Sequence, residues 1–134
     1  MKYFSIKELE RSETASRLGI NNAAPPEARA ALENLVLCLL DPLREAYGHP
    51  IFVNSGYRCP KLNAAIKGAA NSQHMKGEAV DIDTRKGPKE NEKLFNLIRE
   101  RFDFDQVIDE KNFAWVHVSF KSPKKNRRQT LHLK

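Results

Sequence analysis

Two histidines and an aspartate stand in two short motifs that together could hold a metal ion. Residues 72–81 contain His74 and Asp81, and residues 115–119 contain His117. Two imidazoles and one carboxylate suit a catalytic zinc ion that keeps one position open for water. Zinc held in this way polarises a carbonyl group and lowers the pKa of its bound water to about 7. The motifs therefore predict a metal-dependent hydrolase.

Alternating apolar and polar residues indicate how two of these ligands could meet. In residues 79–83 the valine and isoleucine would face the core, which leaves Asp81 on the opposite face of a strand. The same rule places His117 on the non-core face of a strand over residues 115–120. If the two strands are neighbours, opposing β-carbons lie about 5 Å apart. We expect His74 to reach the same site from a loop.

The elements around this site are predicted mainly from helical patterns. Ser5 and Glu8 fit a capping box, in which each side chain satisfies a backbone donor of the other, at the start of a first helix. Pro25 and Pro26 open the longest helix, because proline in the first turn loses no helical hydrogen bond, and apolar residues then recur at helical spacing. The predicted helices span residues 5–19, 25–47, 60–66 and 88–101.

Strands are predicted over residues 51–54, 79–83, 104–110, 115–120 and 129–133. A long helix followed by several strands that could form one mostly antiparallel sheet indicates the α+β class. With 134 residues the chain has the size of one domain. Within that single domain, residues 1–134, we expect a helical N-terminal part (1–50), a metal-site core (51–120), and a basic loop with a C-terminal strand (121–134).

The composition is that of a globular protein. Hydrophobic residues make up 40% and charged residues 30% of the chain, and no apolar stretch approaches the roughly 18 residues of a membrane span. The N-terminus has no apolar run of signal-peptide length, which predicts a protein that is cytoplasmic at synthesis. Cys38 lies in an apolar run, so we expect a buried thiol there and no disulfide with Cys59.

The net charge is +6, and much of the excess lies in the basic segment, residues 121–128. Such a run is usually a solvated loop, and the sharper alternative is attraction to a polyanion such as nucleic acid or a cell wall. Few aromatic residues stand near Lys124, Lys125, Arg127 and Arg128 to stack on bases. Nucleic-acid binding is therefore not the favoured function.

The motifs resemble those of the zinc D-alanyl-D-alanine carboxypeptidase family, whose relatives include D-Ala-D-Ala dipeptidases, phage peptidoglycan endolysins and the hedgehog signalling domain. Ser-x-His-x-x-Gly-x-Ala-x-Asp stands at residues 72–81 and Trp-x-His-x-Ser at residues 115–119, and residues 54–58 and 104–108 also match. The resemblance spans residues 3–119. It implies a hedgehog or DD-peptidase-like fold.

The resemblance also assigns roles to the motif residues. The two histidines and the aspartate bind zinc in the family, which transfers to His74, Asp81 and His117 and implies Zn²⁺ as the cofactor. The arginine after Ser-Gly-Tyr, here Arg58, binds a substrate carboxylate or carbonyl in related enzymes. A guanidinium fork suits that task, although a surface ion pair is the alternative.

Two further residues have assigned positions beside the substrate. Ser72 matches a position that hydrogen-bonds substrate, and an ordinary turn serine is the alternative. Trp115 would form a wall of the site or orient His117, and packing in the core is the alternative.

The general base is where the sequence departs from the commonest family pattern. Many relatives have an acidic residue three positions before the last zinc histidine, and Ala114 stands there. A hedgehog-like arrangement, with a glutamate at the end of the preceding strand, resembles Glu110. Strand alternation does not separate Glu110 from Asp109, because a bulge could exchange their faces. We expect Glu110 to be the catalytic base, with Asp109 second.

The expected function is a zinc metallopeptidase that hydrolyses an amide bond in peptidoglycan stem peptides. It would act as a D-Ala-D-Ala carboxypeptidase or as an endolysin-type endopeptidase at an L-Ala-D-Glu bond, reaching the cell wall after phage- or holin-dependent release. The alternative is a non-catalytic, zinc-stabilised binding module of the hedgehog-like type, which the missing acid at Ala114 favours. The sequence leaves the peptide bond and the oligomeric state open.

Overall fold

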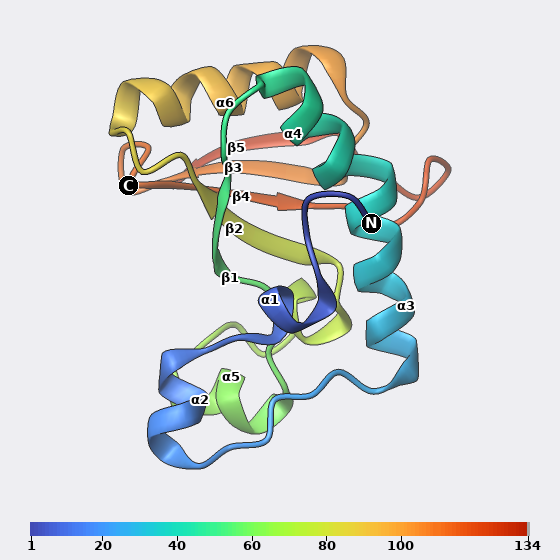
Figure 1. The fold of residues 1–134 in the computed structure, drawn as a ribbon, viewed down its shortest axis with the longest axis vertical. Helices are drawn as coiled ribbons and strands as arrows, with labels where there is room; N and C mark the ends of the chain where they lie inside the picture. The colour runs from blue at the N-terminus through green and yellow to red at the C-terminus, as the bar shows by residue number, and fades with distance from the viewer. Residues whose placement is uncertain (134) are drawn as a thin grey trace.

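The central sheet pairs the two strands that carry predicted ligands. The computed structural model describes residues 1–133, and its strands follow the order β1-β2-β4-β3-β5. All neighbouring strands are antiparallel except β3 and β5, which are parallel. The predicted α+β class and mostly antiparallel sheet are confirmed (Figure 1). The strands are β1 (Phe52–Ser55), β2 (Ala79–Asp83), β3 (Gln106–Glu110), β4 (Trp115–Ser119) and β5 (Gln129–Leu133).

The register of β2 and β4 is the one that a shared site requires. Asp81 lies directly opposite His117 in the antiparallel pair. Val80, Ile82 and Val116, their neighbours along the two strands, are fully buried in the hydrophobic core. The alternation of side chains therefore sends the apolar residues to the helices and both polar residues to the other face of the sheet, as predicted.

The long helical segment packs its apolar side chains into the hydrophobic core, but it is less regular than predicted. It comprises α3 (Pro26–Leu35), a π-helical segment η1 (Val36–Leu40) and α4 (Asp41–Tyr47). Pro42 has no N–H for an i→i−4 bond, and the amide of Asp41 instead donates to the carbonyl of Val36, five residues earlier. The predicted apolar face is nevertheless buried, and Gly48 ends the segment in a left-handed conformation.

The single helix predicted over residues 5–19 is wrong, because two short helices stand there. They are α1 (Ile6–Glu10) and α2 (Glu13–Leu18). The Ser5 hydroxyl accepts a 3.1 Å hydrogen bond from the Glu8 amide, as the capping box predicts. Ser12 caps a second start by accepting from the Ala15 amide at 3.1 Å, and Arg11 between the helices is extended. A second capping serine therefore divides the segment.

The remaining helices flank the motifs. They are α5 (Pro60–Ala65), the 3₁₀ helix η2 (Gln73–Lys76) and α6 (Pro88–Arg101). His74 lies on η2 and not on the predicted loop, because the Ser72 hydroxyl caps this turn by accepting from the His74 amide at 3.1 Å. In Figure 1, α6 and α4 lie on the same side of the sheet, and α2 and α5 lie together near the end of β1.

The basic segment is tied to the sheet at a buried carboxylate. Asp105, just before β3, is fully buried. Its two oxygens accept from Arg127 Nε at 3.0 Å and Nη2 at 2.7 Å, and Oδ1 also accepts from the Arg127 amide at 2.9 Å. Gln73 Nε2 donates to Oδ2 at 2.9 Å. One part of the basic segment is thus a structural clamp.

The two cysteines form no disulfide, as expected, but Cys38 is exposed rather than buried. It lies on the outer side of the π-helical segment, where its thiol donates to Asn34 Oδ1 at 3.3 Å. The apolar run around it therefore buries its neighbours and not the thiol. Within residues 1–133, no helix has the length and apolar character that crossing a membrane would need.

Candidate metal centre

The structure brings His74, Asp81 and His117 together from three separate elements. One nitrogen or oxygen atom of each lies within 4.8 Å of the others. His117 Nδ1 is 2.9 Å and His74 Nε2 is 3.4 Å from the same oxygen, Oδ1 of Asp81. His74 and Asp81 are buried, with exposed fractions of 3% and 7%. The three residues, called the metal cluster below, therefore form a nearly enclosed group of potential ligands.

The orientation of His74 is fixed by a backbone carbonyl. His74 Nδ1 lies 2.7 Å from the carbonyl oxygen of Gly56. A proton on Nδ1 donates to this oxygen and leaves the lone pair of Nε2 facing the cluster, which is the arrangement commonly seen for metal-binding histidine. A β-carbon at Gly56 would lie 2.3 Å from the carbonyl oxygen of Leu9. Only glycine allows this close approach of α1 to the exit of β1.

A second motif glycine places η2 against the long helix. Gly77 has φ of +73°, and a β-carbon there would lie 2.3 Å from the carbonyl oxygen of Ala28 in α3. Side chains rarely adopt this backbone conformation, and the space is closed as well. Gly77 therefore ends η2 where His74 can face β2.

The charge of Asp81 is stabilised in the cluster. Burial alone would raise the pKa of its carboxyl group, but the adjacent imidazoles of His117 and His74 outweigh burial and hold the pKa well below its ordinary value. The group is thus an ionised carboxylate beside two imidazoles. Two imidazole nitrogens and one carboxylate oxygen are ligands that suit Zn²⁺. A cluster of three protein ligands, and not four, is typical of a catalytic zinc site.

Of the two candidate bases, Glu110 lies beside the metal cluster. Its Oε2 is 4.0 Å from His117 Nδ1 and accepts from Trp115 Nε1 at 3.1 Å. Asp109 is directly opposite Val116, on the other face of the sheet. Its carboxylate accepts from the Phe113 amide at 2.8 Å and lies 3.0 Å from His132 Nδ1.

A strained turn sets the positions of Glu110 and Trp115. Lys111, Asn112 and Phe113 have φ of 50°, 57° and 63°, a run of left-handed residues without glycine. Such residues each cost on the order of 1 kcal/mol or more and persist only where the surroundings impose them. Asn91 of α6 imposes them here, because its Nδ2 donates to the carbonyl oxygens of residues 113 and 114 at 2.8 and 3.2 Å. No pattern in the sequence indicated this role for Asn91.

Arg58 is held next to the cluster by three of its nitrogens. Nη2 lies 3.5 Å from Asp81 Oδ2, Nε donates to Ser55 Oγ at 3.2 Å, and Nη1 donates to Asn63 Oδ1 at 3.3 Å. Burial lowers the pKa of Arg58, and the negative charges of Asp81 and Glu110 oppose this effect. The guanidinium is therefore oriented before any substrate binds.

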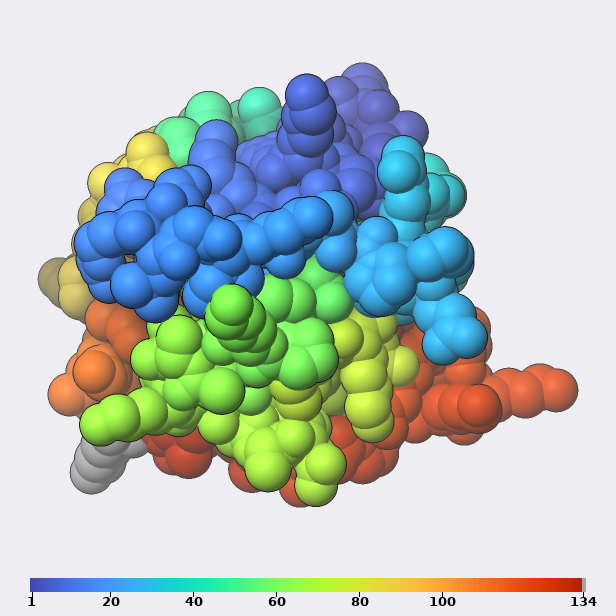
Figure 2. All heavy atoms as spheres, turned by 90° about the horizontal axis from the view of Figure 1, so that it is seen from below, coloured from blue at the N-terminus to red at the C-terminus, as the bar shows by residue number. Residues whose placement is uncertain are grey.

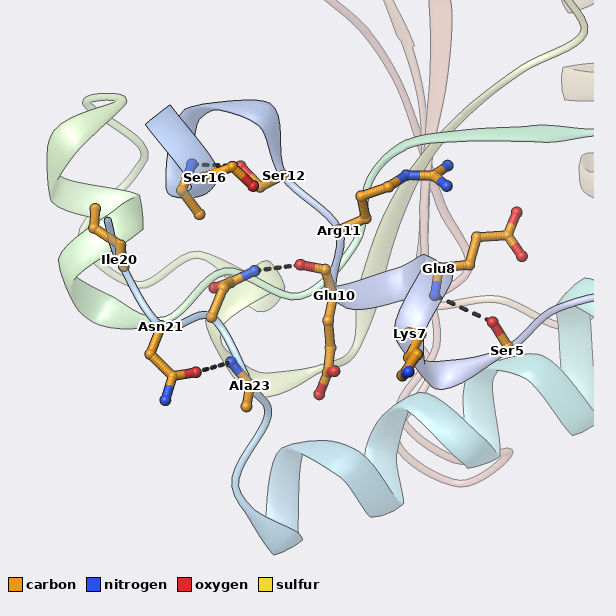
Figure 3. A pocket seen from close by; sticks show the side chains of 12 residues that line it. Ser5, Lys7, Glu8, Glu10, Arg11, Ser12, Ser16, Ile20, Asn21 and Ala23 are labelled. Carbon is orange, nitrogen blue, oxygen red and sulfur yellow. Dashed lines mark hydrogen bonds between the residues drawn. The ribbon is translucent and has the colours of Figure 1, made fainter. Parts of the chain in front are cut away.

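Asn22 was not predicted and connects the N-terminal segment to the backbone around Arg58. Its Nδ2 donates to the carbonyl oxygens of Glu10 at 2.8 Å and Tyr57 at 2.9 Å, and its Oδ1 accepts from the Cys59 amide at 2.7 Å. Asn22 is buried. A polar residue in a loop-like sequence carries no signal of such a contact, because the partners are distant in the chain. Figure 3 shows Glu10 next to the segment that contains Asn21 and Ala23.

The comparisons with known proteins agree with this geometry. A stretch of 80 residues is 36% identical to the protein named zinc D-Ala-D-Ala carboxypeptidase from Streptomyces albus G. The match covers 59% of this chain and 30% of that relative, so the chain spans less than a third of the relative's length. Residues 2–119 match the family described as peptidase M15, a range that includes the whole metal cluster, Arg58 and Glu110. The resemblance predicted from the motifs is confirmed, and the chain belongs to the peptidase M15 family.

Proposed function

We propose that this protein is a zinc peptidase that hydrolyses an amide bond in the stem peptides of peptidoglycan. One observation carries the proposal: three potential zinc ligands converge within 4.8 Å, and the Glu110 carboxylate lies 4.0 Å from one of them. A structural zinc site usually has four protein ligands, whereas this cluster has three and an adjacent acid. Membership of the peptidase M15 family supports the same reaction class.

His74 Nε2, His117 Nδ1 and the Asp81 carboxylate would hold the ion. Zinc bound there would supply a Lewis acid that polarises the substrate carbonyl and lowers the pKa of a water molecule. Gly56 keeps the proton of His74 on Nδ1, so the other ring nitrogen stays available. The nearby Arg58 guanidinium offsets part of the negative charge of Asp81.

Glu110 is the proposed general base. Its carboxylate would accept a proton from the attacking water and then deliver that proton to the nitrogen of the leaving amine. Trp115 donates to the same oxygen, so the indole both orients the carboxylate and leaves the other oxygen free. This arrangement gives Trp115 a role as a positioning residue.

Arg58 and Ser72 are the proposed substrate-binding residues. The oriented guanidinium of Arg58 would direct its remaining N–H groups toward a substrate carboxylate or carbonyl. Ser72 Oγ accepts from the His74 amide, which leaves the hydroxyl proton free to donate to a substrate oxygen. Both residues adjoin a zinc ligand, so substrate held by them would lie next to the ion.

The test measures newly formed amines in purified peptidoglycan. The zinc-loaded protein should release amino groups that react with fluorodinitrobenzene, and a chelator should stop the release. Mass spectrometry of the products distinguishes loss of a terminal D-Ala from cleavage after L-Ala. Zinc binding without any release of amines would overturn the proposal and favour the binding module that the absence of an acid at Ala114 suggested.

A further inference from the structure

A cleft adjoins the metal cluster at Arg58. Its volume is about 600 Å³, and it lies between the α1–α2 connection, β1 and α5. Three arginines line it, Arg11, Arg58 and Arg85, with Glu13 as the one acidic residue among those that line it within residues 1–133. Figure 2 shows α2 (blue) and α5 (green) next to each other on the face that contains these elements. The cleft therefore carries an excess of two positive charges.

Two of these arginines have no anionic partner of their own. Within residues 1–133, neither Arg11 nor Arg85 takes part in an ion pair, whereas Arg58 lies against Asp81. Arg85 stacks on the ring of Phe52 with its guanidinium carbon 4.0 Å from the ring centre. Stacking fixes the plane of the guanidinium and leaves its N–H groups to a ligand. Figure 3 shows the Arg11 side chain extending toward β1, away from Asn21 and Ala23.

Some of the residues that line the cleft are aliphatic. Val53, Leu62 and Ile66 contribute to the lining, and the Ile66 side chain is 40% exposed. Small aliphatic groups can pack against such side chains, and carboxylates can bind the guanidinium groups of the lining arginines. A peptide of small aliphatic and acidic residues has both features.

We propose that this cleft is an anionic subsite in which Arg11 and Arg85 bind a second carboxylate of the peptide substrate, beyond the group that faces Arg58. The proposal rests on the proposed function for the identity of the peptide, and it makes acidic stem peptides the preferred substrates. Arg11 and Arg85 are then specificity-determining residues that act on binding and not on the chemical step.

The test compares three synthetic stem pentapeptides: one with both carboxylates free, one with the D-Glu carboxylate amidated and one with the C-terminus amidated. Binding is measured by calorimetry on metal-free protein, and hydrolysis is measured separately on zinc-loaded protein. Because exposed ion pairs contribute little free energy, we expect Arg11→Gln or Arg85→Gln to lower the affinity for the free peptide about two- to fivefold. The double variant should lower it about five- to twentyfold. Arg101→Gln, at the end of α6, is the matched control for charge.

The double variant should bind the peptide with both carboxylates free more weakly than the wild type does. One of the two amidated peptides should bind to the wild type and to the double variant with equal affinity. Arg101→Gln should leave the affinity for all three peptides unchanged. Equal affinity of the wild type for all three peptides, or an equal loss in the control, would overturn the subsite. If the double variant shows the predicted loss of affinity but the wild type hydrolyses no peptide, the subsite stands and the proposed function fails. If the peptides are hydrolysed but the double variant binds them as tightly as the wild type does, the proposed function stands and the subsite fails.

Discussion

Asp81 and Asp105 are two buried aspartates of the same sheet region, and they differ in what surrounds them. Both have exposed fractions below 8%, with Asp81 at 7% and Asp105 at 0%. Burial alone would raise the pKa of each, but the imidazoles beside Asp81 and the contacts of Asp105 with Arg127 and Gln73 hold both pKa values well below the ordinary range. Both carboxylates are therefore charged at neutral pH.

Their partners separate them. Asp105 is held by Arg127 and Gln73, whose N–H groups stay protonated at any physiological pH. Asp81 faces two imidazoles, which can exist as neutral bases and direct lone pairs toward a cation. A carboxylate fully satisfied by permanent donors is structural, and one that faces exchangeable partners can serve as a ligand. Substitutions at the two positions should therefore have opposite consequences.

The largest effect is expected from the removal of a ligand. His117→Ala leaves two of the three proposed zinc ligands, so the loss of zinc affinity should exceed the roughly 10- to 100-fold typical of changes outside the ligand shell, and amide hydrolysis should fall to background. Metal analysis and the amine-release assay measure both effects. Retention of zinc and activity by this variant would remove His117 from the site.

Glu110→Gln should keep zinc and lose turnover. The amide cannot accept a proton, so kcat should fall by about 10²- to 10⁴-fold, while zinc content stays at the wild-type level. Asp109→Asn is the matched control, because its carboxylate holds the Phe113 amide and His132 on the other face of the sheet. That variant should affect stability more than kcat. The reverse pattern would transfer the catalytic role to Asp109.

Asp105→Asn should lower stability and spare zinc. The substitution breaks a buried, charge-assisted contact with Arg127, and the free energy of unfolding should fall by about 2–4 kcal/mol. Urea unfolding at neutral pH measures this change. An unchanged free energy of unfolding would mean that the contact between Asp105 and the basic segment does not stabilise the fold.

The same carboxylate should contribute to acid sensitivity. The pKa of Asp105 is lower in the folded protein than its ordinary value of 3.8, so its stabilising effect is present above about pH 4 and is lost as the pH falls through the folded value. The stability difference between wild type and Asp105→Asn should accordingly narrow below about pH 4. Urea titrations from pH 7 to pH 2 test this, and a constant difference would contradict it.

The smallest effect is expected at Trp115. Trp115→Phe keeps the aromatic ring and removes the one N–H that donates to Glu110, so kcat should fall by about tenfold or less with zinc content unchanged. A steady-state assay with a KM measurement tests this, because a role as a mere wall of the site would change KM instead. A lower kcat with unchanged KM would indicate a positioning residue, and a changed KM would indicate a contact surface.

The sequence predicted what depends on local pattern. Strand alternation placed Asp81 and His117 on one face, and their register is the expected one. Proline marked the starts of α3, α5 and α6, and glycine marked the ends of α2 and α4. The break at Ser12 was not predicted, because a single helix that starts at the Ser5 cap also fits residues 5–19. The π-helical segment was not predicted, because the apolar spacing around Pro42 fits a regular helix equally well.

The sequence could not predict contacts between distant side chains. Asn22 and Asn91 hold the backbone near Arg58 and Trp115, yet neither asparagine belongs to a motif or a periodic pattern in the sequence. Alternation alone left open which of Glu110 and Asp109 faces the metal cluster, and only the register of β3 and β4 shows that Glu110 does. Long-range polar contacts carry no periodicity, and periodicity is what the sequence reveals.

The most direct test of the difference between the two aspartates is the zinc content of three proteins after extensive dialysis. Wild type and Asp105→Asn should each retain one zinc ion per folded chain, and Asp81→Asn should retain none while remaining folded. Zinc retained by Asp81→Asn, or lost from Asp105→Asn while that variant remains folded, would contradict the assignment of the metal cluster.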